Sequence, residues 1–199
     1  MAYNSKTEIL KILLKQFTFK WTITSLGEET NLSRVGIWKA LKKLESEKLI
    51  SLFPIGKGKT STFIISLNWD NPLLEKHLSL ILTEEALKNK RWIKNFEILE
   101  NMVNFLILYG SILYSSGEAN DIDLVGVVSS EDNFSKIEEA LQKIQKTQYK
   151  KIHLENFTKK EFEKEIKKPN KIFIDAIKRG IVLFGQEEFI KFVKDLKNE

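Results

Sequence analysis

The stretch Phe105–Val128 constrains the fold of this chain most, because it joins two short apolar runs through a Gly-Ser turn and a loop. The first run, Phe105–Tyr109, ends at Gly110, and its length favours a buried strand over a helix. The second run, Asp121–Val125, alternates acidic and apolar side chains, as a strand with one buried face does. We therefore predict two strands with a tight turn after the first.

Asp121 and Asp123 are the acidic residues of the second run. Residues two apart on a strand share one face, roughly 6.6 Å apart along the backbone. Like charges this close destabilise each other unless a cation neutralises them, so we predict a Mg²⁺ site. Ser111 is expected to cap a helix whose free N–H groups would bind phosphate. The alternative is a surface hairpin with solvated aspartates.

Gly110-Ser111, nine intervening residues and then Asp121-Ile122-Asp123-Leu124 resemble the signature of the polymerase-beta-type nucleotidyltransferase superfamily. The segment Lys178–Gly185 resembles the tail that closes many of its members. The resemblance covers about 99–194 and implies a small mixed sheet covered by helices. It also implies that Gly110 and Ser111 hold a nucleoside triphosphate, expected to be ATP, and that both aspartates hold Mg²⁺.

The reaction implied by this resemblance is transfer of NMP from the triphosphate to an acceptor hydroxyl, with pyrophosphate as leaving group. Three acceptors remain open: a protein hydroxyl, as in antitoxin-type enzymes that modify a toxin partner, a nucleic-acid end, or a small molecule. The alternative function is a DNA-binding transcriptional regulator whose nucleotidyltransferase-like domain is catalytically degenerate and binds only nucleotide or a protein partner.

Active members of the superfamily usually place a third carboxylate on a neighbouring strand, and His153 stands at the corresponding position here. Glu155 lies one strand period further along and shares its face. Glu155 could replace the third carboxylate, His153 could act as a general base, or the domain could bind nucleotide without catalysis. The remaining alternative is that both residues are solvated on an open strand.

The positive charge of the chain is concentrated in its first third. Residues 1–70 contain 11 Lys and Arg against 6 Asp and Glu, which leaves 21 basic and 21 acidic residues beyond. A basic module followed by a neutral one indicates a polyanion-binding domain joined to a second domain.

Capped amphipathic segments followed by a hairpin, Leu49–Phe53 and Thr62–Leu67, resemble a winged helix-turn-helix domain. Its recognition helix would begin after Ser33 and enter the major groove of duplex DNA. The predicted contacts are polar, basic or aromatic: Ser33, Arg34, Trp38, Lys39, Lys42 and Lys43 on the helix, and Lys57 and Lys59 at the hairpin tip. The alternative is a solvated helix face, with the winged helix used for protein contact or homodimerisation through residues such as Trp38.

The expected fold class is therefore α/β (α+β), with a winged helix at 1–70, a helical linker at 71–98 and a nucleotidyltransferase-like domain at 99–199. No apolar run approaches eighteen residues, so we expect a cytoplasmic protein without membrane contact. The chain has no Cys and only two His, in separate regions, which excludes thiolate metal sites and disfavours zinc.

Overall fold

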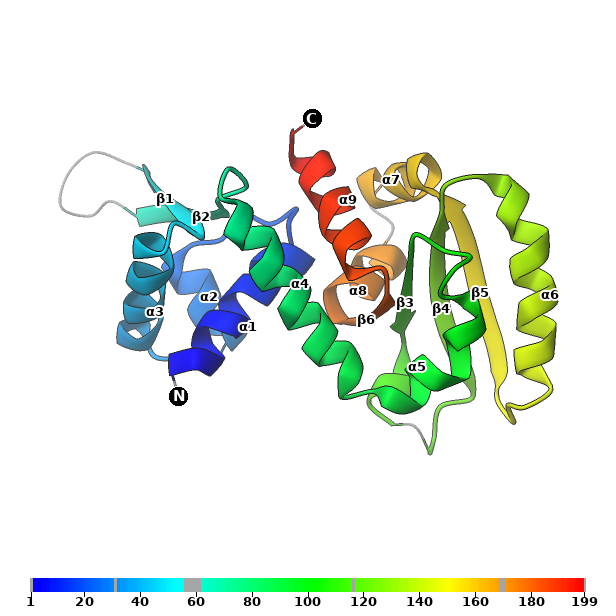
Figure 1. Ribbon diagram of the computed structural model, residues 1–199. Coiled ribbons are helices and arrows are strands. Elements are labelled where there is room, and N and C mark those ends of the chain that lie inside the picture. The colour runs from blue at the N-terminus through cyan, green and yellow to red at the C-terminus, as the bar shows by residue number, and fades with distance from the viewer. Residues whose placement is uncertain (1, 31, 56–61, 116, 169–170, 199) are drawn as a thin grey trace. The chain divides into compact units, whose positions relative to one another are not determined.

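The structure is a computed structural model that describes residues 2–30, 32–55, 62–115, 117–168 and 171–198. The chain divides into two compact units, Met1–Ile81 and Leu82–Glu199, each with its own sheet (Figure 1). This mixed α/β architecture confirms the predicted fold class. The predicted functional ranges 1–70, 71–98 and 99–199 stay predictions, because the bounds of a compact unit do not show where a functional domain begins.

The first unit consists of three helices followed by a hairpin. The helices are α1 (Ala2–Lys15), α2 (Ile23–Thr30) and α3 (Arg34–Ser46), and the strands are β1 (Ile50–Ile55) and β2 (Thr62–Leu67). The two strands are antiparallel, with Ile50 opposite Leu67 and Ile55 opposite Thr62. This is the predicted order of helix, turn, helix and wing.

Hydroxyl side chains determine where two of these helices begin. Ser33 caps α3 as predicted, since its Oγ accepts a hydrogen bond from the Gly36 N–H at 3.1 Å. Thr22 precedes α2, and its Oγ1 accepts from the Ser25 N–H at 3.2 Å while the Ser25 Oγ accepts from the Thr22 N–H at 2.9 Å.

The core of the first unit fixes which side of α3 faces solvent. Leu26 of α2 and Ile65 of β2 are buried, as are four residues of α3 at helical spacing, Ile37, Ala40, Leu41 and Leu44. Apolar residues at this spacing form one stripe, so the remaining side of α3 is turned outward.

The second unit is a four-stranded sheet with helices on both faces. A long helix, α4 (Pro72–Leu87), spans the division between the units and is followed by α5 (Lys90–Phe96) and the 3-10 turn η1 (Glu97–Leu99). The remaining elements are β3 (Phe105–Tyr109), η2 (Ser111–Leu113), β4 (Asp121–Val128), η3 (Glu131–Asn133), α6 (Phe134–Gln145), β5 (Lys151–Thr158), α7 (Lys159–Lys167), α8 (Lys171–Arg179), β6 (Ile181–Phe184) and α9 (Gln186–Asn198).

The strand order in this sheet is β5-β4-β3-β6. β4 runs parallel to β5 and antiparallel to β3, which also pairs antiparallel with β6. Residues opposite each other on paired strands face the same side, so Tyr109, Asp123 and His153 lie on one face of the sheet. The predicted mixed sheet is confirmed.

The two faces of the sheet are covered differently. One face, which includes Leu106, Leu108, Ile122 and Leu124, packs into a core with residues of α5 and α6. On the other face, Phe105 and Phe157 contact aromatic rings of α7, α8 and α9. Asp121 and Asp123 lie on this second face, at the opposite end of β4 from the aromatic cluster. The aromatic cluster therefore packs α7, α8 and α9 onto one part of this face, and the start of β4 with its two aspartates stays accessible.

Phe162 of α7 is the centre of the aromatic cluster. Its side chain is fully buried, and its ring centroid lies 5.6 to 6.1 Å from the rings of Phe105, Phe157, Phe173 and Phe192. Aromatic pairs at such distances contribute beyond the area that they bury.

We predict that Phe162→Ala destabilises the chain by about 3–5 kcal/mol, because it leaves a cavity among four rings that cannot close fully. The free energy of unfolding in urea, followed by circular dichroism, measures this loss. Tyr149→Ala is the matched control, since this aromatic side chain of the same unit is fully exposed. Equal stability losses in the two variants would contradict the assigned core.

Candidate functional site

The carboxylates of Asp121 and Asp123 lie at the start of β4, in the second unit. Ile122 and Leu124 between and beyond them are buried, whereas both aspartates are only partly covered. This alternation confirms that both acids share one face, away from the core formed with α5 and α6. The strand therefore presents two carboxylates close together at an accessible edge of the sheet.

Gly110 makes room for the Asp123 carboxylate. Its φ of 84° lies in the left-handed region, which residues with a Cβ rarely adopt. A Cβ at this position would stand 2.4 Å from the Asp123 Oδ2. Glycine is thus required both by the backbone and by the packing of the acidic side chain, and the turn and the acidic pair form one local arrangement.

The predicted helix after this turn is absent: Ser111 begins a single 3-10 turn, η2, of three residues. Gly110 occupies the cap position, and no side-chain hydrogen bond caps the turn. The expectation that Ser111 caps a helix was therefore wrong, and a turn this short has no macrodipole to attract an anion. Ser111 itself is exposed, immediately after the glycine that contacts Asp123.

Tyr109 belongs to the same site, although the sequence analysis did not select it. It pairs with Asp123 across β3 and β4 and is half-buried. Burial, with further contributions from the charges of Glu155 and Asp123, raises the pKa of Tyr109 to about 12. The phenol, neutral at physiological pH as tyrosine ordinarily is, stays protonated to a higher pH and can donate a hydrogen bond. The signal in the sequence was its position directly before Gly110 at the end of the strand.

His153 lies opposite Asp123 in the register of β4 and β5. Its Nδ1 is 3.6 Å from the Asp123 Oδ1, an ion-pair distance that exceeds a normal hydrogen bond. Glu155 lies opposite Val125, two residues further along the strand, and is exposed. The structure thus places His153 against the acidic pair and Glu155 near Tyr109, on the same face.

The residues present fit Mg²⁺ only in part. Carboxylate oxygens are the ligands this ion prefers, and it is commonly held by one or two carboxylates together with water and substrate phosphates. Asp121 and Asp123 meet that requirement. Among the described residues, however, no group of three or more His, Asp or Glu side chains could hold a metal ion without other ligands.

In the first unit, five of the predicted DNA contacts at α3 are exposed. Arg34, Lys39, Lys42 and Lys43 are exposed basic residues of the helix, and Ser33 is exposed at its cap. They lie outside the buried stripe of Ile37, Ala40, Leu41 and Leu44. The helix therefore separates an apolar inner side from a basic outer side.

Trp38 and Lys42 are already engaged with their neighbours. The Trp38 ring lies 5.8 Å from that of Phe63 on β2, and the Lys42 Nζ lies 4.8 Å from the Trp38 ring centroid. The same Nζ is 2.8 Å from the Glu45 Oε2. Trp38 thus connects α3 to the wing. The ion pair with Glu45 partly neutralises the charge of Lys42, so we expect Lys42 to attract an anion less than Lys39 or Lys43 does.

A groove of about 540 Å³ lies beside Trp38, with Val35, Arg34 and Phe63 in its lining. Val35 is 65 % exposed on the outer side of α3. The sequence analysis missed it, since an apolar residue in a helix is more often buried; its position between Arg34 and Gly36, off the buried stripe, is the available signal. Lys57 and Lys59, the other predicted contacts, lie outside the described residues.

The comparison with protein families agrees with this arrangement. Residues 6–55 match the model of a family described as an HTH domain. The first unit contains a helix-turn-helix domain. The match supports DNA binding by the first unit and does not extend to the second unit, for which the nucleotidyltransferase resemblance stays a prediction. No curated protein and no solved structure matches the chain. None of the described helices has the length and apolar content of a membrane span.

We predict that Gly110→Ala destabilises the chain by about 1–3 kcal/mol, because the new Cβ requires a left-handed backbone and displaces the Asp123 carboxylate. Urea unfolding measures the change. Gly117→Ala is the matched control in the following loop, where a Cβ would meet nothing within 4 Å. A Gly110→Ala variant as stable as Gly117→Ala would contradict the close contact.

Proposed function

We propose that this chain is a DNA-binding protein that uses its second unit to transfer NMP from a nucleoside triphosphate to an acceptor hydroxyl. DNA binding is supported by the helix-turn-helix match over residues 6–55. The observation that supports nucleotidyl transfer is the acidic pair of β4, whose Asp123 carboxylate lies against the left-handed Gly110 after β3.

In the first unit, α3 lies in the major groove of the DNA, and its exposed side chains contact either phosphates or base edges. Arg34, Lys39 and Lys43 neutralise phosphates or donate to base edges, while Ser33 donates to phosphate at the start of the helix. Trp38 packs on Phe63 of β2 and stays a predicted DNA contact beside these basic residues. Lys57 and Lys59, which the sequence predicts to contact phosphate or the minor groove, lie outside the described residues.

In the second unit, Asp121 and Asp123 would hold Mg²⁺ together with water and triphosphate oxygens. Bound there, the ion would supply positive charge next to the transferred phosphate and the leaving pyrophosphate. Gly110 and Ser111 bind the phosphates through backbone N–H groups and the Ser111 hydroxyl, since the exposed turn stands directly beside Asp123.

The side chains around the acidic pair have separate roles in this proposal. His153, whose Nδ1 lies 3.6 Å from the Asp123 Oδ1, can accept the proton of the acceptor hydroxyl. Tyr109 remains protonated and donates a hydrogen bond, since its pKa is raised to about 12. Glu155 is an additional carboxylate on the same face, one strand period beyond His153.

A specific observation favours a second candidate function. The position opposite Asp123 holds His153 instead of a carboxylate, and an imidazole is a poor ligand for a hard cation. In this alternative the second unit binds nucleotide without transfer, and the chain is a DNA-binding regulator. Single-turnover transfer with labelled ATP separates the two: His153→Asp would gain transfer in the regulator, whereas the natural chain already transfers in the enzyme.

We predict that the chain binds duplex DNA with an affinity that falls steeply as salt rises, because phosphate contacts release condensed counterions. Replacing Arg34, Lys39 and Lys43 by Ala should flatten the slope of log affinity against log salt by about three units, roughly one per contact. Fluorescence anisotropy with a labelled duplex measures this slope.

The matched control replaces Lys136, Lys160 and Lys191, three exposed lysines of the second unit, by Ala. It removes the same charge and should leave the slope unchanged. Equal flattening in both triple variants would show that α3 has no special part in DNA binding.

We also predict that Asp121→Asn and Asp123→Asn each abolish Mg²⁺-dependent ATP binding, with thermal stability unchanged or slightly higher, because one of two neighbouring charges is removed. Calorimetric titration with and without Mg²⁺ measures the binding. Asp195→Asn, an exposed acid of α9, is the control. Unchanged ATP affinity in both site variants would exclude the metal site.

A further inference from the structure

A second recessed surface of the Leu82–Glu199 unit lies where α5 meets the segment between α6 and β5. It is a hollow of about 270 Å³, and its lining includes Arg91, Trp92, Asn95, Gln148, Tyr149 and Lys150. The Asn95 Nδ2 and the Gln148 Oε1, 3.5 Å apart, connect its two sides. The volume is below that of most small-molecule pockets, which suits a single flat group better than a larger ligand.

One aromatic side chain gives this hollow a stacking surface. Tyr149, in the lining, is fully exposed, so its ring is open to solvent. Trp92 is buried beside the hollow, and the Arg91 guanidinium lies 5.0 Å from its ring centroid, so this cation is held in place. An exposed aromatic ring with a cation in the same hollow is a surface on which a nucleobase can stack.

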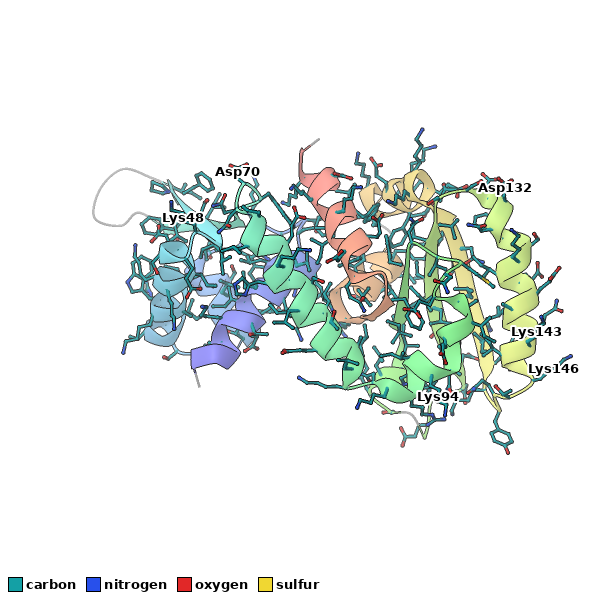
Figure 2. The ribbon with its side chains drawn as sticks, viewed as in Figure 1. Lys48, Asp70, Lys94, Asp132, Lys143 and Lys146 are labelled. Carbon is teal, nitrogen blue, oxygen red and sulfur yellow. The ribbon has the colours of Figure 1, made fainter. Side chains whose placement is uncertain are left out.

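The segments around the hollow are rich in positive charge. Residues 88–95 and 143–150, from which most of its lining comes, contain seven basic residues and no acidic one. Figure 2 shows the labelled side chains of Lys94, Lys143 and Lys146 at this end of the unit, and all three are exposed. Lys143 lies in the last turn of α6 and Lys146 at its C-cap.

Lys150 has a structural part in this arrangement. Its Nζ donates to the backbone carbonyl of Ala119, in the loop before β4. The segment that places Tyr149 is thus fastened to the loop that leads to Asp121, and Gln145 fastens it further, since its Nε2 donates to the Lys150 carbonyl at 2.9 Å. Tyr149 is therefore presented on a held turn.

We propose that this hollow is a binding site for single-stranded nucleic acid. One base stacks on Tyr149 at the hollow, and the amides of Asn95 and Gln148 face its polar edge. Arg91, Lys94, Lys143 and Lys146 contact the phosphates on either side. A duplex does not fit, because its bases are stacked on one another and unavailable to Tyr149. This proposal is independent of DNA binding by α3 and of nucleotidyl transfer.

The test measures anisotropy of labelled twelve-residue oligo-dT and oligo-U with the full chain, in which Arg34, Lys39 and Lys43 are Ala so that α3 does not contribute. Tyr149→Ala should weaken binding at least fivefold, since stacking on one aromatic side chain is worth roughly 1–3 kcal/mol. Tyr149→Phe should stay within twofold of the parent. With α3 intact, duplex affinity should not change in either variant.

A double variant tests the charges. Lys94→Ala with Lys146→Ala should flatten the single-strand salt slope by about 1.4 units, at roughly 0.7 per contact, while Lys136→Ala with Lys160→Ala leaves it unchanged. Tighter binding of oligo-U would identify RNA, through its 2′-OH, as the favoured source, and tighter binding of oligo-dT would identify DNA.

Three results would overturn the proposal. Oligonucleotide affinity within twofold of the parent in Tyr149→Ala would exclude stacking. Equal flattening in the two double variants would exclude a local site. Binding of anionic phosphatidylserine vesicles without oligonucleotide binding would assign the surface to a membrane instead. Because Tyr149 and the four lysines are exposed, none of these variants should impair folding.

Discussion

The contact between Gly110 and the Asp123 carboxylate is the constraint on which the candidate site of the second unit depends. β3 and β4 are antiparallel, and Tyr109 stands opposite Asp123, so the residue after Tyr109 must turn away immediately beside an acidic side chain. Only a residue without a Cβ does this, since a Cβ would lie 2.4 Å from the Asp123 Oδ2. The phosphate-binding turn that we propose and the acidic pair therefore occur together for a steric reason, before any ligand is considered.

The strands of this site could be predicted from the sequence because their signals are local. Alternation in Asp121–Val125 places both acids on one face, and the apolar run Phe105–Tyr109 ends at the glycine. The turn after Gly110 was harder to predict. A Gly-Ser pair suits a helix start, and whether the chain continues as an α-helix or as one 3-10 turn depends on packing that the local sequence does not contain. Tyr109 was missed for a related reason, since its role depends on cross-strand neighbours.

The distribution of surface charge also depends on the fold and could not be predicted from the local sequence. Beyond residue 70 the basic and acidic residues are equal in number, which indicated a neutral second domain. The fold separates them, because α5 and the segment after α6 bring together two stretches without a single acid, 88–95 and 143–150. Neutrality of a sequence therefore does not imply neutrality of any surface. In the first unit the net charge of the sequence predicted a basic surface correctly, because the basic residues of α3 already lie on one side of a single helix.

The charges around Asp123 bear on both proposed functions of the second unit. Asp121, Asp123 and Glu155 place three carboxylates on one face, and burial together with the charges of Glu155 and Asp123 opposes ionisation of Tyr109. Lys151, opposite Asp121 in the register of β4 and β5, brings a positive charge to the same face. In the function that we propose, Mg²⁺ bound with a triphosphate would offset the remaining negative charge, in the enzyme and in the regulator alike. What distinguishes the two proposed functions is whether His153, whose Nδ1 lies 3.6 Å from the Asp123 Oδ1, can accept a proton when Mg²⁺ is bound to that carboxylate.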